Sequence, residues 1–250
     1  MIGKGGNSKV YLVERESKFY ALKVVNIEMD YKLKENTLKE IRTLEDLKGM
    51  FGIIKLIDTQ IDQDIIYILL EYGSTDLNKY IRKNTLSIYA ILFFWEQMLK
   101  ILKGLHARKY IHADVKPANF VIVDGNVRVI DFNISSKIRG DTTRLDLERP
   151  CGTLNYLAPE VLDSTKKERR RASDVWSLGI ILYEMVYKKV PVDFNSQGDW
   201  LDKIQNIKIE EGEMKYKKIL KMIRECLRRN PKERPTVSEL LEELEQEWEG

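Results

Sequence analysis

The sequence predicts an α+β fold, in which a small strand-rich part, residues 1–72, is followed by a larger and mainly helical part, residues 73–250. Runs of β-branched and aromatic residues dominate the first part, whereas apolar residues recur at helical spacing in the second part. The pattern changes near residue 73, and no repeat or low-complexity segment interrupts it. A chain of 250 residues can bury a substantial core as one large domain or as two lobes.

Four strands and one helix are expected in the first part. The runs "KVYLV" and "KFYALKVVNI", separated by the polar "ERES", predict a hairpin, and "IIKLIDT" and "IIYILLE" predict two further strands. Between these pairs, the segment "NTLKEIRTLEDLKG", residues 36–49, has apolar residues at three-residue spacing. This spacing predicts a helix that Gly49 can end.

Helices dominate the second part. The segments "DLNKYIRK" and "SIYAILFFWEQMLKILKGLHARK" come first, and the apolar residues of the longer segment form one helical stripe. A loop follows, and then the strand "FVIV", a turn at Asp124-Gly125-Asn126 and the strand "VRVI". The segment "DVWSLGIILYEMVYKK" is apolar nearly all round, as expected of a buried central helix. Two amphipathic helices, "KYKKILKMIRECLRR" and "TVSELLEELEQEW", are expected near the end.

Composition and charge exclude several classes of protein. The 42 basic and 39 acidic residues give a net charge of +3, so we expect no strong field for nucleic acid or membrane. Cys151 and Cys226 are too few for a disulfide framework, and no Cys/His cluster has zinc spacing. No apolar run can span a bilayer, and "MIGKGGNSKV" lacks the apolar core of a signal peptide. We therefore expect an intracellular protein without nucleic-acid or membrane partners.

Three polar residues surround the hairpin predicted in "IHADVKPANFVIVDGNVRVIDFNIS". Asp114 and Asn119 precede its first strand, and Asp131 follows its second strand. Carboxylate and amide oxygens suit Mg²⁺, which usually completes its shell with water and nucleotide phosphate. A phosphate cradle is therefore expected elsewhere. The segment "IGKGGNSKVYLV" is the candidate, because Gly3, Gly5 and Gly6 would let backbone N–H groups approach phosphate.

The order of these motifs resembles that of the protein kinases. The Gly-rich loop, Lys23 in "ALKVV", Glu40 in the predicted helix, "HADVKPAN", "DFN" and "APE" occur in the kinase order and at fitting spacings along the whole chain. The resemblance implies a bilobal kinase fold, with residues 1–72 as the β-rich N-lobe and residues 73–250 as the helical C-lobe. It also implies ATP and Mg²⁺ as cofactors, and proteins as substrates.

The resemblance implies a role for each catalytic position. Lys23 would hold the α- and β-phosphates, and Glu40 would keep its ammonium group in position. Asp114 would orient the substrate hydroxyl and accept its proton. Asn119 and Asp131 would hold Mg²⁺, which neutralises charge on the transferred phosphoryl group.

Other positions resemble the substrate and nucleotide sites of serine/threonine kinases. Lys116 would be a cation near the γ-phosphate, and Thr153 in "GTLNYLAPE" would belong to the substrate loop, so serine or threonine is the expected acceptor. The backbone of residues 71–73 would bind adenine, with Leu70 behind it and Asp76 near the ribose. The implied nucleotide-binding residues are Gly3, Gly5, Val10, Ala21, Lys23, Leu70, Glu71, Tyr72, Gly73 and Asp76.

Three further residues resemble structural positions of the kinase C-lobe. Asp174 resembles the buried acid that braces the catalytic loop, and Glu160 with Arg234 resembles the ion pair that anchors the activation segment. His106 and His112 have no metal-ligand partners in the sequence, so we expect both to form structural hydrogen bonds.

Four segments are similar to the monopolar-spindle kinases, dual-specificity enzymes of the spindle assembly checkpoint: "IGKGGNSKVY", "GSTDLNKYI", "PANFVIVDGNVRVIDFNIS" and "GTLNYLAPE". This narrower resemblance implies kinetochore substrates, activity on tyrosine as well as serine and threonine, and a nuclear or kinetochore location in place of a general cytoplasmic one. It also implies autophosphorylation, with transient self-association. We expect phosphate on the activation segment at Thr142 or Thr143, with Thr153 less available.

Three departures from the kinase pattern leave other functions open. Ala113 replaces the arginine before the catalytic aspartate, Asn133 replaces the glycine of the metal-binding triplet, and Ser8 replaces the third glycine of the loop. A pseudokinase that binds nucleotide or serves as a scaffold, and a serine/threonine kinase of another family, remain as alternatives. The active enzyme is favoured because the lysine and both aspartates are present. The basic run "KKERRRAS", residues 166–173, predicts a solvated loop more readily than a docking or nuclear-import patch.

Overall fold

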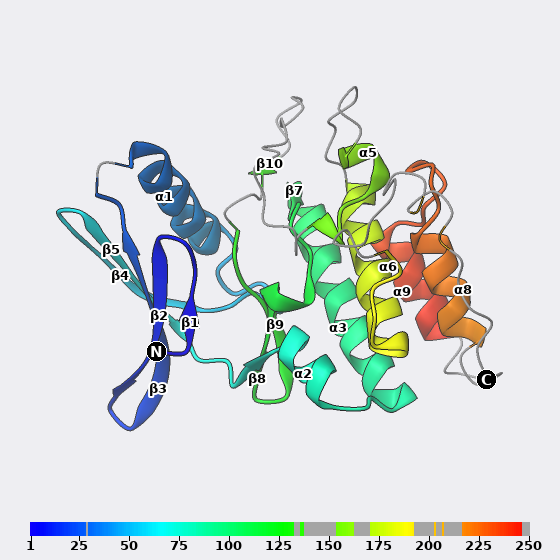
Figure 1. Cartoon of the computed structure of the whole chain (residues 1–250), viewed down its shortest axis with the longest axis horizontal. Helices are drawn as coiled ribbons and strands as arrows, with labels where there is room; N and C mark the ends of the chain where they lie inside the picture. The colour runs from blue at the N-terminus through cyan, green and yellow to red at the C-terminus, as the bar shows by residue number, and fades with distance from the viewer. Residues whose placement is uncertain are drawn as a thin grey trace. The chain divides into compact units, whose positions relative to one another are not determined.

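The structure is a computed structural model, and it describes residues 1–28, 30–132, 136–137, 154–162, 171–192, 203, 207 and 217–246. Its secondary structure confirms the α+β class (Figure 1). The chain forms two compact units. Unit 1 comprises Met1–Asp76 and Phe120–Asn133, and unit 2 comprises Leu77–Asn119 and Ile134–Gly250. The lobe boundary expected between residues 72 and 73 stays a prediction.

Unit 1 is built on a five-stranded antiparallel sheet in the order β1-β2-β3-β5-β4. The strands are β1 Gly3–Lys4, β2 Ser8–Arg15, β3 Lys18–Asn26, β4 Leu56–Asp62 and β5 Ile65–Glu71. The predicted hairpin of β2 and β3 turns at Glu16 and Ser17, whose φ angles are 55° and 59°. Two successive left-handed residues form the type of turn whose twist matches the flanking strands.

Helix α1, Tyr31–Asp46, packs against this sheet and starts five residues before the segment predicted from residue 36. Its first turn is stabilised by Asp30, whose carboxylate accepts a hydrogen bond from the backbone N–H of Leu33 at 2.8 Å. Ile41 of α1 is buried in one cluster with Ile66 and Ile68 of β5. Figure 1 shows α1 beside the five-stranded sheet. The helix that carries Glu40 is therefore held by apolar burial.

A smaller sheet in unit 1 has the order β6-β8-β9, with β6 Thr75–Asp76, β8 Phe120–Val123 and β9 Asn126–Val129. The predicted turn lies between β8 and β9, with Asp124 at φ 48° and Gly125 at φ 77°. Gly73 passes close to β8, because a Cβ atom on this glycine would lie 2.8 Å from Cβ of Val121. Only glycine fits between the end of β5 and this sheet without a shift of the backbone.

Helices form the core of unit 2. They include α2 Leu77–Lys83, α3 Ile88–Ala107, α5 Pro159–Leu162, α6 Arg171–Tyr187, α8 Lys217–Cys226 and α9 Val237–Gln246. A short 3-10 helix, Pro117–Asn119, precedes β8, and β7 Tyr110–Ile111 pairs with β10 Ser136–Lys137. Helix α6 is buried along most of its length, which confirms the predicted central helix. No helix in the described part of the chain is long and apolar enough to cross a membrane.

Gly179 controls how closely α6 approaches α8. A Cβ atom at this position would lie 2.5 Å from Cβ of Cys226 and 3.1 Å from a methyl group of Leu227. We therefore expect Gly179→Ala to lower the free energy of unfolding by about 1–3 kcal/mol, because the packed helices must separate. Denaturant unfolding measures this change. Gly6→Ala is the matched control, since its new methyl group meets nothing within 4 Å and its effect should be about 0.5 kcal/mol or less.

Candidate active site

The register of the five-stranded sheet gathers several of the predicted nucleotide-binding residues on one face. Val10 of β2 lies opposite Lys23 of β3, and Ala21 of β3 lies opposite Leu70 of β5. Ala21 and Lys23 are two residues apart on one strand, so their side chains point to the same face. Gly3 of β1 lies opposite Val10. Residues from four strands thus meet on one surface of the sheet, although they lie far apart in the sequence.

Lys23 forms a close ion pair with Glu40 of α1. Its Nζ donates to both carboxylate oxygens, at 2.7 and 2.8 Å, and only 16% of the Lys23 side chain and 4% of the Glu40 side chain are exposed. Burial opposes the charged form of Lys23, but the carboxylates of Glu40 and Asp131 outweigh it and raise the lysine pKa above its usual value. The ammonium group is therefore charged and fixed in direction, as positioning of phosphate requires.

Substitution of Lys23 tests this assignment. We expect Lys23→Met to lower turnover at least about a hundredfold, because the cation that would stabilise phosphate charge is lost. The variant also leaves Glu40 buried without its cation, so the double variant Lys23→Met/Glu40→Gln serves to separate folding from catalysis. Steady-state kinetics and circular dichroism provide the measurements. Lys18→Met, at the exposed start of the same strand, is the control, and unchanged turnover in Lys23→Met would disprove the assignment.

The Gly-rich loop connects β1 to β2. The backbone N–H of Gly5 donates to the carbonyl of Ser8 at 2.8 Å, so the loop folds back on itself. A cavity of about 470 Å³ is lined by Gly5, Gly6, Tyr11 and Val24 among others. Tyr11 and Val24 are sequence neighbours of Val10 and Lys23, and side chains alternate along strands. This cavity therefore lies on the opposite face of the sheet from the predicted nucleotide-binding residues.

The residues predicted to contact adenine and ribose lie at the end of β5 and in the short strand that follows. The carboxylate of Glu71 accepts the backbone N–H of Lys55 at 2.8 Å and lies 3.6 Å from Nε of Arg128. These contacts occupy the side chain of Glu71, and its backbone N–H donates to the carbonyl of Lys55 at 3.0 Å, so a base would have to meet other backbone groups of residues 71–73. Tyr72 packs edge-on against Phe19 with ring centroids 6.5 Å apart. The segment is thus supported on both sides by side chains of unit 1.

Asp131 follows β9 in a left-handed backbone conformation, with φ at 65°. Left-handed backbone is uncommon for a residue other than glycine, and aspartate tolerates it better than most. Asp131 is half-buried, and its charge is one of those that raise the pKa of Lys23. Unit 1 therefore brings together three predicted site residues: the lysine, the glutamate of α1 and this aspartate.

Unit 2 brings together the other catalytic candidates on the loop before β8. Nζ of Lys116 donates to Oδ2 of Asp114 at 2.8 Å, and Nδ2 of Asn119 donates to the same oxygen at 3.1 Å. Nδ2 of Asn119 also donates to the backbone carbonyl of Asp114 at 2.8 Å. Asp114 is only 7% exposed. A buried carboxylate held by two donors has a fixed orientation, which a group that orients a substrate hydroxyl needs.

Asp174 of α6 is hydrogen-bonded to the backbone of this loop, as the resemblance implied. Its two carboxylate oxygens accept the backbone N–H groups of His112 at 3.0 Å and Ala113 at 2.9 Å. Ala113 has a φ of 66°, so the carboxylate stabilises a strained backbone directly before Asp114. Nε2 of His106 lies 2.9 Å from Oδ2 of Asp174. This hydrogen bond confirms the structural role expected for that histidine.

Glu160 and Arg234 form the predicted ion pair. Nη1 and Nη2 of Arg234 each donate to one carboxylate oxygen of Glu160 at 2.7 Å, which is the bidentate geometry that suits a guanidinium group. The arginine also stacks on the ring of Trp176, with its guanidinium carbon 4.9 Å from the ring centroid. The pair links α5 to the segment before α9 inside unit 2.

The sequence did not predict a second buried polar contact beside α5. The hydroxyl of Tyr156 donates to Oε2 of Glu184 at 2.7 Å, and both groups are buried. Burial, together with the neighbouring carboxylate, raises the pKa of the Tyr156 hydroxyl. No local pattern indicates this pair, because its members are 28 residues apart and one of them lies inside an apolar helix.

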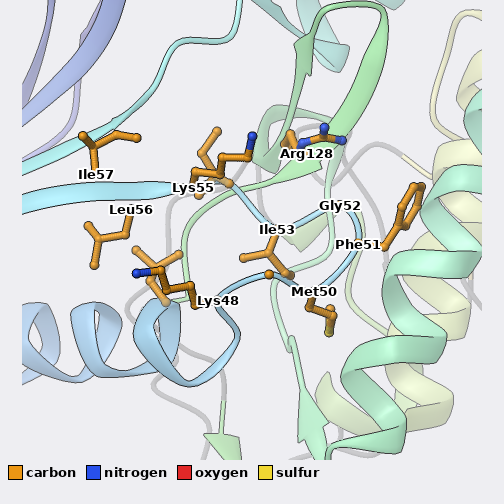
Figure 2. A pocket seen from close by; sticks show the side chains of 12 residues that line it. Lys48, Met50, Phe51, Gly52, Ile53, Lys55, Leu56, Ile57 and Arg128 are labelled. Atoms are coloured by element: carbon orange, nitrogen blue, oxygen red, sulfur yellow. The ribbon is translucent and has the colours of Figure 1, made fainter.

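One cavity of unit 1 lies apart from these groups. It has a volume of about 420 Å³ and is bordered by the end of α1, the loop after it, the start of β4 and Arg128 (Figure 2). Phe51, Ile53 and Leu56 contribute apolar surface to it, and neither Lys23 nor Glu40 does. The cavity is therefore separate from the predicted nucleotide-binding face.

The side-chain oxygens of Asn119 and Asp131 are ligand atoms that suit a hard divalent cation. Both hydrogen bonds from Asn119 to Asp114 are donated by the amide nitrogen, so the amide oxygen of Asn119 points away from Asp114. Asp131 offers a carboxylate, and oxygen ligands of both kinds suit Mg²⁺. In the part of the chain that the structure describes, no three His, Cys, Asp or Glu side chains gather as a metal site. Mg²⁺ usually completes its shell with water and nucleotide phosphate, so one or two oxygen ligands from the protein are enough to hold it.

Several predicted positions lie outside the described residues. These are Asn133 of the metal triplet and the activation-segment threonines Thr142, Thr143 and Thr153. Their predicted roles stay predictions, as do the catalytic and binding roles of the residues above.

Comparison with known proteins identifies the class. Residues 1–244 match the family model described as "Protein kinase domain". The chain belongs to the protein kinase domain family, which confirms the predicted fold. Membership implies use of ATP, a divalent metal ion and protein substrates.

Three relatives indicate which group of protein kinases the chain is similar to. The chain is 47% identical to "Serine/threonine-protein kinase MPS1" of Encephalitozoon cuniculi, covering 96% of this chain and 41% of that protein. It is 41% identical to "Probable serine/threonine-protein kinase mps1" of Dictyostelium discoideum and 38% identical to "Dual specificity protein kinase Ttk" of Danio rerio. These matches cover 96% and 97% of this chain and 26% of each relative. The resemblance to the monopolar-spindle kinases is thus confirmed. The chain spans less than half the length of these relatives.

Proposed function

We propose that this chain is the catalytic domain of an ATP-dependent protein kinase of the mitotic spindle checkpoint. It transfers the γ-phosphate to serine and threonine, and also to tyrosine, of protein substrates. The observation that carries the proposal is the arrangement at Asp114, whose carboxylate is buried and held by Lys116 and Asn119. The names of the relatives support both the serine/threonine and the dual-specificity activity.

Each residue contributes one part of the reaction. Lys23, held by Glu40, binds the α- and β-phosphates of ATP. Asp114 orients the substrate hydroxyl and accepts its proton as the oxygen forms a bond to the γ-phosphorus and the bond to the β-phosphate oxygen of ADP breaks. Lys116 provides positive charge near the transferred group.

Mg²⁺ is the divalent ion that we propose, and Asn119 and Asp131 would hold it. When bound, it neutralises charge on the phosphates. Neutralisation matters because phosphoryl transfer is accelerated mainly by positioning and by stabilisation of charge. The resemblance to spindle kinases supports an intracellular location in the nucleus, at kinetochores.

A transfer assay tests the proposal and separates it from a scaffold function. The chain is incubated with Mg²⁺ and ATP labelled in the γ-phosphate, with myelin basic protein as acceptor, and its own phosphorylation is mapped by mass spectrometry. We expect label on the acceptor and on the chain, with phosphate at Thr142 or Thr143. If ATP raises the melting temperature but no label is transferred even at high enzyme concentration, the scaffold is the correct function.

A further inference from the structure

A basic cavity in unit 2 includes none of the residues 111–119 in its lining, and so none of the loop that carries Asp114. It has a volume of about 550 Å³ and is formed by the end of α3, the start of α6 and the segment that leads into α9. These helices lie side by side in Figure 1, and α3 packs against both α6 and α9. The cavity is thus built from three segments that are distant in the sequence but fixed by helix packing.

Two contacts already described, one ion pair and one hydrogen bond, hold the floor of this cavity. Arg234 lines it and is held by Glu160, and His106 lines it and is held by Asp174. The carboxylates of both acids are therefore engaged by their own partners. Because His106, Asp174 and Arg234 are buried and only 10% of the Glu160 side chain is exposed, these bonded groups form a rigid floor.

Three more cations line the cavity, and these are exposed: Lys103 of α3, Arg171 of α6 and Lys232 before α9. Among the described residues, none of the three side chains has a carboxylate within ion-pair distance. Two acids lie near this rim in the sequence, and both have other partners. Oε1 of Glu233 accepts Nδ2 of Asn230 at 2.9 Å, and the carboxylate of Glu239 accepts the backbone N–H of Thr236 at 2.7 Å. The rim therefore carries positive charge in excess of the negative charge around it.

The walls of the cavity are apolar. Val175 and Val237 are buried there, and Pro231 and Pro235 are partly exposed. None of the described residues that line it is Phe, Tyr or Trp, the side chains on which nucleic-acid bases stack. An apolar hollow with a cationic rim suits a peptide whose apolar side chains are flanked by carboxylates.

We propose that this cavity binds an acidic segment of a protein partner. Aliphatic side chains of the segment fill the hollow, and its carboxylates pair with Lys103, Arg171 and Lys232. The site is distinct from the catalytic groups, and the proposal concerns binding alone, so it does not rest on the proposed kinase activity. It also gives a role to Arg171, which ends the arginine run of "KKERRRAS".

Fluorescence anisotropy of the whole chain tests the proposal, with a labelled glutamate peptide that has two central leucines as the probe. The variant Lys103→Glu/Arg171→Glu/Lys232→Glu should weaken binding at least about tenfold, or about 1.4 kcal/mol. The matched control Lys18→Glu/Lys83→Glu/Arg224→Glu makes the same change in net charge at exposed cations outside the cavity. It should bind within about twofold of the unaltered chain. Equal loss in the two triple variants would overturn the proposal, because only the general charge would then matter.

Two further experiments test whether the apolar hollow takes part in binding and whether the peptide binds apart from the nucleotide site. A peptide with serines in place of the leucines should bind several-fold more weakly, and equal binding would show that the hollow takes no part. Saturating ATP with Mg²⁺ should leave the affinity unchanged, since the cavity is not lined by the predicted nucleotide residues. Displacement of the peptide by ATP, or preferential displacement by a short single-stranded DNA, would contradict the assignment.

Discussion

Asp114→Asn should retain ATP binding and lower phosphoryl transfer by about 10²–10⁴-fold, the range expected when a general base is removed. The carboxamide has nearly the same shape as the carboxylate but cannot accept the hydroxyl proton. It also meets two donors, Lys116 and Asn119, which both point at Oδ2 in the present structure. Turnover is measured from ADP release, and ATP affinity is measured by calorimetry.

The donors on Lys116 and Asn119 would face the new amide group, so Asp114→Asn should also lower the stability of the fold, by a modest amount. Asp114 is 7% exposed, so replacing an acceptor by an amide should lower the free energy of unfolding by about 1–3 kcal/mol. Asp124→Asn in the exposed turn between β8 and β9 is the matched control, and it should change neither turnover nor stability appreciably. A folded Asp114→Asn variant that cannot bind ATP would contradict the proposed role of the aspartate in hydroxyl activation.

The fold could be predicted from the sequence where local periodicity agrees with tertiary packing. Strand β5 and strand β8 occupy the predicted residues, and the long amphipathic helix begins after its cap at Ser87. Helix α1 begins early because its first turn is mostly polar and exposed, so no apolar periodicity marks it. The cap at Asp30 is the signal that could have located its start.

Strand β4 shows where local pattern fails. The run "IIKLIDT" is rich in β-branched residues, yet β4 begins only at Leu56. The backbone N–H of Ile54 donates to the carbonyl of Val129 on β9 at 3.2 Å, and Ile53 forms a bridge to the same residue. These partners lie more than 70 residues away, so the sequence around Ile53 cannot distinguish this loop from a strand.

The candidate site could be predicted as a set of residues but not as a network. The order of the motifs predicts that Lys23 pairs with Glu40, and both hydrogen bonds of that pair are present. It does not indicate that Lys116 reaches back to Asp114, because the pairing depends on the conformation of a short loop. The hydrogen bond between His106 and Asp174 spans 68 residues and depends on how α3 packs against α6.

Asp131→Asn should lower phosphoryl transfer by several orders of magnitude, a larger loss than that expected for Asp114→Asn. It removes a carboxylate from the proposed shell of a hard cation, and such cations prefer charged oxygen ligands. Asparagine tolerates the left-handed backbone found at φ 65°, so the substitution should not distort the chain. It also removes a charge that raises the pKa of Lys23. Part of the activity should return with Mn²⁺, which accepts neutral ligands more readily.

Melting temperatures test the same assignment without reference to activity. In the unaltered chain, ATP with Mg²⁺ should raise the melting temperature more than ATP with a chelator does, and Asp131→Asn should lose most of that difference. Asn133→Gly is the comparison, because asparagine and glycine differ by only about 1 kcal/mol even where a left-handed backbone is required, so turnover should stay within about tenfold. If Asn133→Gly abolished transfer and the metal-dependent shift while Asp131→Asn kept both, Asn133 would have to be the ligand. Asp131 would then act only through its charge on Lys23.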